Sequence, residues 1–564
     1  MIRRKNMIWN GAVALCIAGL LVGCGDDMSI GMESPADDDY WNGDQGNDQN
    51  EMGGSPGEND ADEDFEPEEE EFLVQQVAAT DSYVFVPNQT EGSDTVALID
   101  GRDFSVHPMR VGLQPTQVVA DDVEDQGSVA YVLSTGQPTV AIVRADLSSG
   151  DQRADVRLLP VPWEVNQLAL SPDGRHVLAY IDPNEPINDS ASTASLQTMA
   201  LIRLGDGPGN DEVFQLSVTR IIDNIAFSED GEQAFVVGQE GINRLPLYDI
   251  KSDAFLPAID LGMAPSIFTP QDREVAFSSD GRVMAMRTSQ YAGVGLFDLN
   301  PDEAQIDDHR MIELDGVPTD LDLFEREDGS LRAVVTIRSE DQVVLFDVDE
   351  AMEAEEEDDS FLRIVDATGA DAGIGRLTPD ESMLAVFSTL PLLPTVGLVD
   401  LETESIETFE LRNQIRNLAI SPDSKTAVAV HQAQPGQAPA GDPEAQFRHG
   451  EGITLWDLAT GYRRPLGLRG EPEEIIMTTD ESGHPYLFIM LTADNHADQG
   501  IKRIDLATHR TDFVRLPRRP MQLGVVAGQV FVSQEEETGR ITFFDVATNE
   551  QRTVSGYELN AGIQ

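Results

Sequence analysis

The sequence contains very little cysteine and lysine. Its only two cysteines, Cys16 and Cys24, lie near the N-terminus, so the rest of the chain has neither disulfides nor thiolate chemistry. Only four of the 37 basic residues are lysine, and 102 Asp and Glu residues give a net charge of −65. The negative electrostatic potential of such a chain repels nucleic acids and anionic lipid surfaces, so we expect no nucleic-acid partner.

The sequence also lacks recognisable catalytic motifs. It has no Gly-x-Ser-x-Gly elbow, P-loop, dinucleotide fingerprint or Cys-x-x-Cys pair. Carboxylates are so abundant that no particular pair indicates acid–base catalysis. The acidic, lysine-poor composition is typical of a surface that stays soluble in a salty medium, and a surface that collects divalent cations is the alternative. We therefore expect a non-enzymatic protein and identify no cofactor.

The N-terminus has the parts of a secretory signal. A basic start, Arg3-Arg4-Lys5, precedes a mostly apolar run of 17 residues, Met7–Gly23, which is short for a membrane-spanning helix. The run ends in Leu21-Val22-Gly23-Cys24, which resembles the lipobox of bacterial lipoproteins. The resemblance implies a signal peptide over 1–23 and a lipid on Cys24. An uncleaved N-terminal anchor is the alternative.

Residues 24–72 have the composition of a disordered acidic linker. Between Gly25 and Phe72 there are 19 Asp or Glu residues and no Lys or Arg. Such a segment buries too little apolar surface to offset the entropy of ordering, and its charges extend it. With the lipobox, it predicts a lipid-anchored protein of the bacterial cell envelope, with the outer membrane or cell surface favoured.

From residue 73 onward, one phrase of about 50 residues recurs, and no convincing amphipathic helix interrupts it. Each unit begins with a strand that ends in a Ser-Pro-Asp-Gly type of turn, and its third strand ends in an apolar-Asp-Leu phrase. Pro, Asp and Gly suit a tight turn, and the Asp after the third strand can accept backbone hydrogen bonds. We interpret both carboxylates as turn formers. The clearest copies are Ser171–Gly174, Ser278–Gly281 and Ser421–Ser424 for the turn, and Leu247–Ile250, Thr454–Leu458 and Thr542–Val546 for the third strand.

These phrases resemble the YVTN and WD40-like repeats of bacterial envelope β-propellers. Four strands per repeat and a period of this length are typical of propeller blades. We count ten units over 73–564 and predict an all-β propeller. One large ring is favoured because no Pro/Gly-rich linker divides the array, and two rings are the alternative. Families with such repeats are mostly binding and scaffolding modules, and some are sugar-lactone hydrolases.

The long loops between second and third strands indicate where a site would lie. In a propeller they share a face with the links between blades, opposite the Ser-Pro-Asp-Gly turns. The longest are 182–197, 432–450 and 492–500. The first and the last of these loops carry oxygen-rich side chains that are candidates for a calcium site, although neither of the two has EF-hand spacing. The candidate calcium ligands are Asp182, Asp189, Asp494 and Asp498. His431, His449 and His496 also fall in or beside these loops, but without the paired spacing of zinc ligands.

Two functions from different classes follow. The first is a lipid-anchored module that binds an envelope protein or polysaccharide through the long-loop face. The second is a hydrolase or lactonase with carboxylates, or a divalent ion, at the central channel. The second predicts at least three Asp, Glu or His side chains that converge at the mouth of that channel.

Overall fold

The computed structural model describes residues 77–557 with internal gaps. The gaps are 89–91, 146–153, 164, 183–197, 208, 219–221, 229, 239–240, 249, 251–253, 257–258, 261–272, 289–290, 300–307, 327, 356–357, 391–393, 435, 437–440, 494–496 and 537. The predicted signal peptide and linker lie outside the described residues. The ring described below belongs to the compact unit that contains Val74–Gln564.

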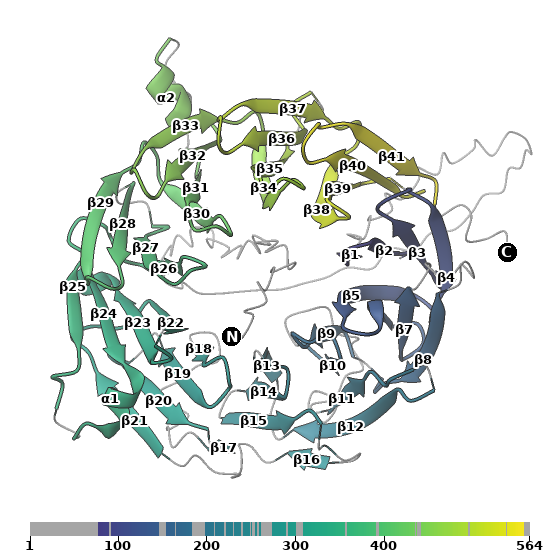
Figure 1. Ribbon diagram of the computed structural model, residues 1–564, viewed down its shortest axis with the longest axis horizontal. Helices are drawn as coiled ribbons and strands as arrows, with labels where there is room; N and C mark the ends of the chain where they lie inside the picture. The colour runs from purple at the N-terminus through teal and green to yellow at the C-terminus, as the bar shows by residue number, and fades with distance from the viewer. Residues whose placement is uncertain are drawn as a thin grey trace, which may run out of the picture. The chain divides into compact units, whose positions relative to one another are not determined.

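Ten four-stranded antiparallel sheets form a single ring (Figure 1). Each sheet is one blade, whose strands run in sequence order from the centre to the rim. This confirms the predicted all-β propeller and the count of ten units, and it excludes the two-ring alternative. Each first strand begins within a few residues of its predicted position, as at β9 (Gln167–Leu170) and β22 (Asp320–Glu325).

Blades 1 to 5 include twenty further strands besides β9, and the outer edge of blade 3 gains the parallel strand β16 from the segment that follows β15. They are β1 (Ala78–Ala79), β2 (Tyr83–Pro87), β3 (Thr95–Asp100), β4 (Val106–Arg110); β5 (Pro115–Val123), β6 (Gly127–Ser134), β7 (Thr139–Ala145), β8 (Asp155–Pro160); β10 (His176–Tyr180), β11 (Thr198–Arg203), β12 (Glu212–Val218), β16 (Ala254–Leu256); β13 (Ile222–Phe227), β14 (Gln233–Gly238), β15 (Gly241–Pro246), β17 (Ile259–Asp260); β18 (Arg273–Phe277), β19 (Val283–Thr288), β20 (Gly293–Asp298) and β21 (Asp308–Glu313).

Blades 6 to 10 complete the ring. After β22 they consist of β23 (Leu331–Ile337), β24 (Gln342–Asp347), β25 (Arg363–Asp366); β26 (Ile374–Leu377), β27 (Met383–Phe387), β28 (Thr395–Asp400), β29 (Ser405–Glu410); β30 (Ile415–Ile420), β31 (Thr426–His431), β32 (Gly452–Asp457), β33 (Arg463–Gly467); β34 (Glu471–Thr479), β35 (Pro485–Thr492), β36 (Gly500–Asp505), β37 (Thr511–Arg515); β38 (Pro520–Val526), β39 (Gln529–Gln534), β40 (Arg540–Asp545) and β41 (Gln551–Ser555).

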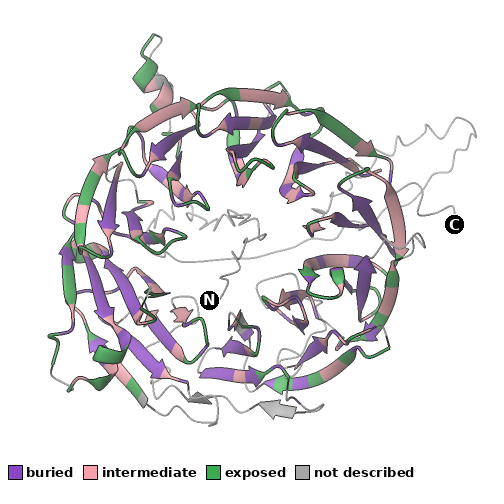
Figure 2. Cartoon of the chain, in the orientation of Figure 1, coloured by how far each residue is buried: buried purple, intermediate pink, exposed green. Residues whose placement is uncertain are grey.

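The hydrophobic core is divided among the blade–blade interfaces. Each hydrophobic cluster joins residues of two neighbouring blades, and every interface has one. Second and third strands are the most buried, and the outer strands carry the exposed positions (Figure 2). Because a blade buries both faces only when neighbours pack against it, the closed ring is the unit of stability.

The turn phrase folds as predicted. In blade 3, the Ser171 hydroxyl donates to Asp173, whose Oδ1 also accepts the Arg175 backbone N–H at 3.0 Å. Gly174 adopts φ +68°, where a side chain would be strained. Burial raises the pKa of Asp173, but hydrogen bonds from His176 and Ser171 outweigh it and lower the pKa to about 2. Asp173 is therefore a turn former.

The carboxylates after the third strands are also turn formers, and one predicted copy was misaligned. Asp457 Oδ1 accepts the Thr460 backbone N–H at 2.8 Å. In blade 4, the predicted phrase Leu247–Ile250 follows the third strand instead of ending it. In blade 8, the turn-forming Asp457 pairs with Thr426 of the second strand. In blade 4, the equivalent pair is Pro246 and Gln233, so Pro246 occupies the position of the Asp. The neighbouring Asp249 lies outside the described residues.

Arginine side chains join the blades at their third strands. Arg203, which stands where most blades have Asp, donates to the carbonyls of Leu247 and Tyr248 in blade 4, at 2.6 and 2.9 Å. Arg503 donates in the same way to Val546 and Ala547 of blade 10. Each guanidinium therefore joins two successive carbonyls of the next blade, through Nη2 in Arg203 and through Nε and Nη2 in Arg503.

The ring closes between blades 10 and 1. The Val77 backbone N–H donates to Gln522 Oε1 at 2.7 Å, and Gln522 Nε2 donates to the Val77 carbonyl at 2.8 Å. Tyr557 packs into the hydrophobic cluster that these two blades share. Residues 558–564 lie outside the described residues.

Short helices interrupt the strands, a feature absent from the sequence-based expectation. They are the 3-10 helix η3 (Arg338–Glu340), α1 (Val348–Glu353) and α2 (Pro443–Arg448). Asp347 and Asp442 cap α1 and α2 by accepting backbone N–H groups of their first turns. Among the described residues, no helix is long and apolar enough to cross a membrane.

Candidate functional site

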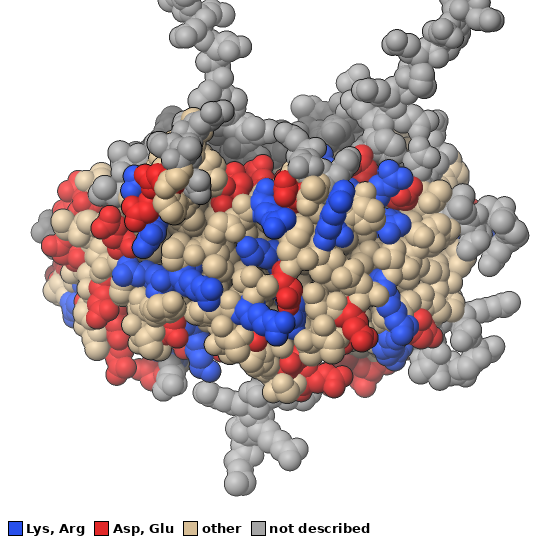
Figure 3. Space-filling model, turned by 90° about the horizontal axis from the view of Figure 1, so that it is seen from above, with Lys and Arg blue, Asp and Glu red and all other residues tan. Residues whose placement is uncertain are grey.

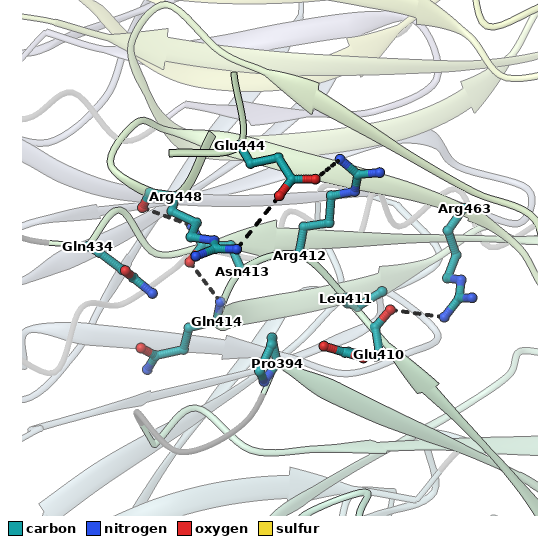
Figure 4. Close-up of a pocket in the computed structure, with 10 residues that line it drawn as sticks. All are labelled: Pro394, Glu410, Leu411, Arg412, Asn413, Gln414, Gln434, Glu444, Arg448 and Arg463. Atoms are coloured by element: carbon teal, nitrogen blue, oxygen red, sulfur yellow. Dashed lines mark hydrogen bonds and ion pairs between the residues drawn. The ribbon is translucent and has the colours of Figure 1, made fainter. Parts of the chain in front are cut away.

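A pocket of about 650 Å³ lies between blades 7 and 8, on the side formed by the long loops and the blade links. We call this side the long-loop face and the opposite side the turn face. The link between the two blades, the loop that carries α2, and the outer strands contribute to the pocket. Its lining residues are Pro394, Glu410, Leu411, Arg412, Asn413, Gln414, Gln434, Glu444, Arg448 and Arg463 (Figure 4).

Backbone contacts hold the link and the loop together. The Asn413 side chain is 1% exposed and donates to the carbonyls of Gln432 and Arg448, at 3.0 and 3.2 Å. The Gln434 backbone N–H donates to the Arg448 carbonyl at 2.8 Å. These hydrogen bonds fix the base of the loop to the link between the blades. Buried contacts as well as exposed side chains therefore hold this wall of the pocket in place.

Three guanidinium groups border this pocket. Glu444 lies between Arg412 and Arg448, with N–O distances of 3.4 and 3.9 Å (Figure 4). Arg463 donates to the Glu410 backbone carbonyl at 3.0 Å, and its guanidinium lies 5.1 Å from the Phe409 ring centroid. Arg412, Arg448 and Glu444 are all more than half exposed, so these ion pairs leave donors accessible to a ligand. The pocket can therefore bind a carboxylate or another polar acceptor.

His431, at the foot of the α2 loop, has a structural role. It is fully buried, its Nε2 lies 2.7 Å from the Thr454 hydroxyl, and its Nδ1 lies 3.1 Å from the Gln414 carbonyl. Burial lowers its pKa to about 4. With both ring nitrogens in hydrogen bonds, His431 does not act as a metal ligand. His449 Nδ1 lies 3.2 Å from the Gln434 carbonyl, and His496 is outside the described residues.

The structure does not bring the predicted calcium ligands together where it describes them. Asp182 follows β10 in blade 3, where its backbone N–H donates to Asn166. Asp498 precedes β36 in blade 9, which is not a neighbour of blade 3. Asp189, Asp494 and the predicted lipidation site Cys24 lie outside the described residues. In the described part of the chain, no three His, Cys, Asp or Glu side chains are arranged to hold a metal ion.

A group of carboxyls lies on the first strands of blades 5 and 6. Burial, followed by the neighbouring charge of Asp320, raises the pKa of Glu274 to about 7, although Arg287 contacts it. Burial and Asp320 also raise the pKa of Asp322 to about 6. Asp320 accepts the Gly375 backbone N–H at 2.6 Å and so links blade 6 to blade 7. The pKa values of Glu274 and Asp322 therefore lie closer to neutral pH than those of ordinary carboxyls, as the pKa of a general acid does.

Sequence reasoning found the loop but missed the pocket residues. The loop 432–450 was predicted to belong to the binding face, whereas Arg412, Arg448 and Arg463 were not singled out. Arginines in the blade links of so acidic a chain were the available signal. Without the fold, nothing indicated that Arg412 and Arg463, about 50 residues apart in sequence, border one pocket.

Comparisons with known proteins show that this chain is similar to them in fold alone. No protein-family model matches the chain, and no curated protein matches its sequence. Among solved structures, a eukaryotic initiation factor has 10% identity and a TM-score of 0.46, over 77% of this chain and 96% of that one. The Dos1 propeller has 10% identity and a TM-score of 0.39, over 65% and 90%. Dihydro-heme d1 dehydrogenase NirN in complex with DHE has 14% identity and a TM-score of 0.36, over 70% and 73%. We transfer no ligand or activity from these proteins.

Proposed function

We propose that this chain is a lipid-anchored protein of the bacterial cell envelope that binds a protein or polysaccharide partner through the pocket between blades 7 and 8. The lipobox-like Leu21-Val22-Gly23-Cys24 and the acidic segment that follows support the anchor and the tether. They are also consistent with an outer-membrane or cell-surface location. No cofactor is part of the proposal.

The pocket is the observation that carries the proposed binding role. Three arginines meet there in a chain whose net charge is −65. Its volume lies within the range of about 300 to 1,000 Å³ that is typical of ligand sites. Binding residues are commonly found on loops that a rigid scaffold positions, and the α2 loop fits this description.

A capture experiment tests the proposal. The mature chain is immobilised and exposed to an envelope extract that has been separated into protein and polysaccharide fractions. We expect one component to be retained by the wild type and lost by the pocket variant Arg412→Ala/Arg448→Ala/Arg463→Ala. The control variant Arg282→Ala/Arg326→Ala removes two exposed arginines of the turn face and should retain it. Equal retention by both variants would contradict the proposed pocket.

A second candidate function is hydrolysis at the central channel, and the raised pKa values of Glu274 and Asp322 favour it. The geometry supports it less well because Glu274 is ion-paired with Arg287 of its own blade. The neighbouring Asp320 accepts the Gly375 backbone N–H across the interface between blades 6 and 7. A panel of esters and lactones tests this role. Turnover that Asp322→Asn abolishes, while the fold is retained, would favour hydrolysis over binding.

A further inference from the structure

Arginines occur near the start of three consecutive blade links. The links from blade 7 to 8, 8 to 9 and 9 to 10 begin with Leu411, Leu468 and Leu516, and only Leu468 is not fully buried. One or two arginines follow within three residues. They are Arg412, Arg469, Arg518 and Arg519, all of them exposed. Arg412 pairs with Glu444 and Arg518 with Glu536, at N–O distances of 3.4 and 2.8 Å. All lie on the long-loop face, as the pocket does.

The middle of this row contains two cations with no counter-charge. Lys502 is half-buried, donates to the Gly467 carbonyl at 3.1 Å, and has its pKa lowered by burial and by the nearby charge of Arg469. Arg469 lies over the Phe513 ring, 5.6 Å from its centroid. In the described part of the chain, neither cation forms an ion pair. Adjacent like charges are unfavourable, and a bound anion would relieve their repulsion.

Figure 3 looks onto the side of the ring at the top of Figure 1, where blades 8 to 10 lie. Lys and Arg side chains lie on this rim among Asp and Glu side chains, so both signs of charge are present there. At physiological ionic strength, charges more than about 8 to 10 Å away are largely screened. The carboxylates of the distant blades are therefore screened, and the carboxylates that compensate the row are its own neighbours Glu444 and Glu536, which lie beside Arg412 and Arg518 and not beside Arg469 and Lys502.

We propose that the arginine row of blades 7 to 10, formed by Arg412, Arg469, Arg518 and Arg519 with Lys502, binds the carboxylates of a linear acidic polysaccharide. The proposal deepens the proposed binding function and rests on it. It names the ligand class as a polymer of sugars with regularly spaced carboxylates, which extends from the pocket along the neighbouring links. Guanidinium groups bind carboxylates with two parallel hydrogen bonds.

The surface favours a polysaccharide over an acidic protein. Protein interfaces have a core of buried aromatic and apolar side chains. Among the described residues of blades 7 to 10, the exposed large apolar side chains are Leu390 and Tyr462. Tyr462 follows the third strand of blade 8 and so lies on the turn face, whereas Leu390, between β27 and β28, lies on the long-loop face. One exposed apolar side chain does not make the core of a protein interface, and cations repeated in successive links match a partner whose charge repeats along its length.

The test measures how the mature chain binds a soluble linear polyuronate. The row variant is Arg469→Gln/Arg518→Gln/Arg519→Gln, and the control is Arg282→Gln/Arg326→Gln. A neutral glucan and poly-glutamate of similar length serve as alternative ligands. At about 0.15 M salt, we expect the row variant to bind polyuronate roughly tenfold more weakly than the wild type, with a shallower dependence of log Kd on log salt concentration. The control should bind like the wild type, and the neutral glucan should not bind.

Each alternative result has a definite meaning. Tight binding of poly-glutamate with equal dependence on the row would overturn the polysaccharide assignment in favour of an acidic protein partner. Equal losses in the row and control variants, or no binding of polyuronate by the wild type, would overturn the proposal. If only the pocket variant Arg412→Ala/Arg448→Ala/Arg463→Ala loses its partner, the proposed function stands and the row proposal fails.

Discussion

Near the centre of the ring, a single polar side chain on a first strand connects each of several blades to the next. Gln117 accepts the Leu168 backbone N–H at 2.7 Å, and Glu474 accepts that of Leu523 at 2.6 Å. Gln522 makes the same bond at the closing interface. Glu474 is 5% exposed, and burial raises its pKa to about 7. The same position is therefore neutral in two blades and ionisable in the third.

Glu474→Gln should remove part of the pH dependence of stability. Between pH 4.5 and about 7, the folded state holds a proton on Glu474 that the unfolded state has released, so stability falls as the pH rises through this window. Above pH 7, this shift of the pKa lowers the free energy of unfolding by roughly 3 kcal/mol. The amide keeps the bond to Leu523 without the charge. Urea unfolding at pH 5 and pH 8 measures the effect.

The matched control is Glu481→Gln, an exposed position in the turn of the same blade. It should follow the wild-type pH profile. If Glu474→Gln loses as much stability between pH 5 and pH 8 as the wild type does, Glu474 is not the protonated group.

At the scale of elements, the acidic insertion 349–360 is ordered by one arginine. Arg310 donates to the carbonyls of Ala351, Glu355 and Asp358, at 2.6, 2.9 and 3.1 Å. Its guanidinium also lies 4.9 Å from the Phe361 ring centroid. These contacts hold α1 and the residues after it against blade 5, although the segment carries many like charges.

Arg310→Met should loosen this insertion while leaving the ring intact. Methionine keeps an apolar stem against Phe361 but cannot donate to the carbonyls. Hydrogen exchange should accelerate over 348–362, and the free energy of unfolding should fall by about 1 to 2 kcal/mol. Arg282→Met, which removes an exposed ion pair with Asp298, is the control. Unchanged exchange in the insertion would show that Arg310 does not order it.

How far the sequence predicts this structure depends on how local each feature is. The Ser171–Gly174 turn and the Asp457 turn could be predicted because all the interacting atoms lie within a few residues. The misaligned phrase at Leu247 shows the limit, because strand register depends on pairing partners. The pocket and the blade connections of Arg203 and Arg503 could not be predicted, since they form only when neighbouring blades meet.

At the scale of the whole molecule, the seam between blades 10 and 1 determines whether the ring stays closed. Gly539 adopts φ +77°, and a Cβ there would lie 2.2 Å from the Tyr557 ring. Tyr557 is 2% exposed and belongs to the cluster shared by blades 10 and 1. A side chain at 539 therefore displaces Tyr557 from the seam.

Gly539→Ala should destabilise the ring by roughly 2 to 4 kcal/mol, since it adds a clash to the cost of a left-handed backbone. Gly528→Ala is the matched control, because Gly528 has φ +71° but nothing within 4 Å of its Cβ position. Gly528→Ala should lose only the smaller amount of stability that a side chain in a left-handed backbone conformation costs. Urea unfolding of both variants compares them. Equal losses would mean that Tyr557 contributes nothing to closure.

The most direct test of the account is a hydrogen-exchange footprint of the mature chain with and without its captured envelope partner. The proposed function predicts protection of the link 411–414 and the loop 432–450, which border the pocket of blades 7 and 8. The Ser171–Gly174 and Ser421–Ser424 turns on the opposite face should exchange at unchanged rates. Protection confined to those turns, or to the first strands near Glu274 and Asp322, would contradict the account.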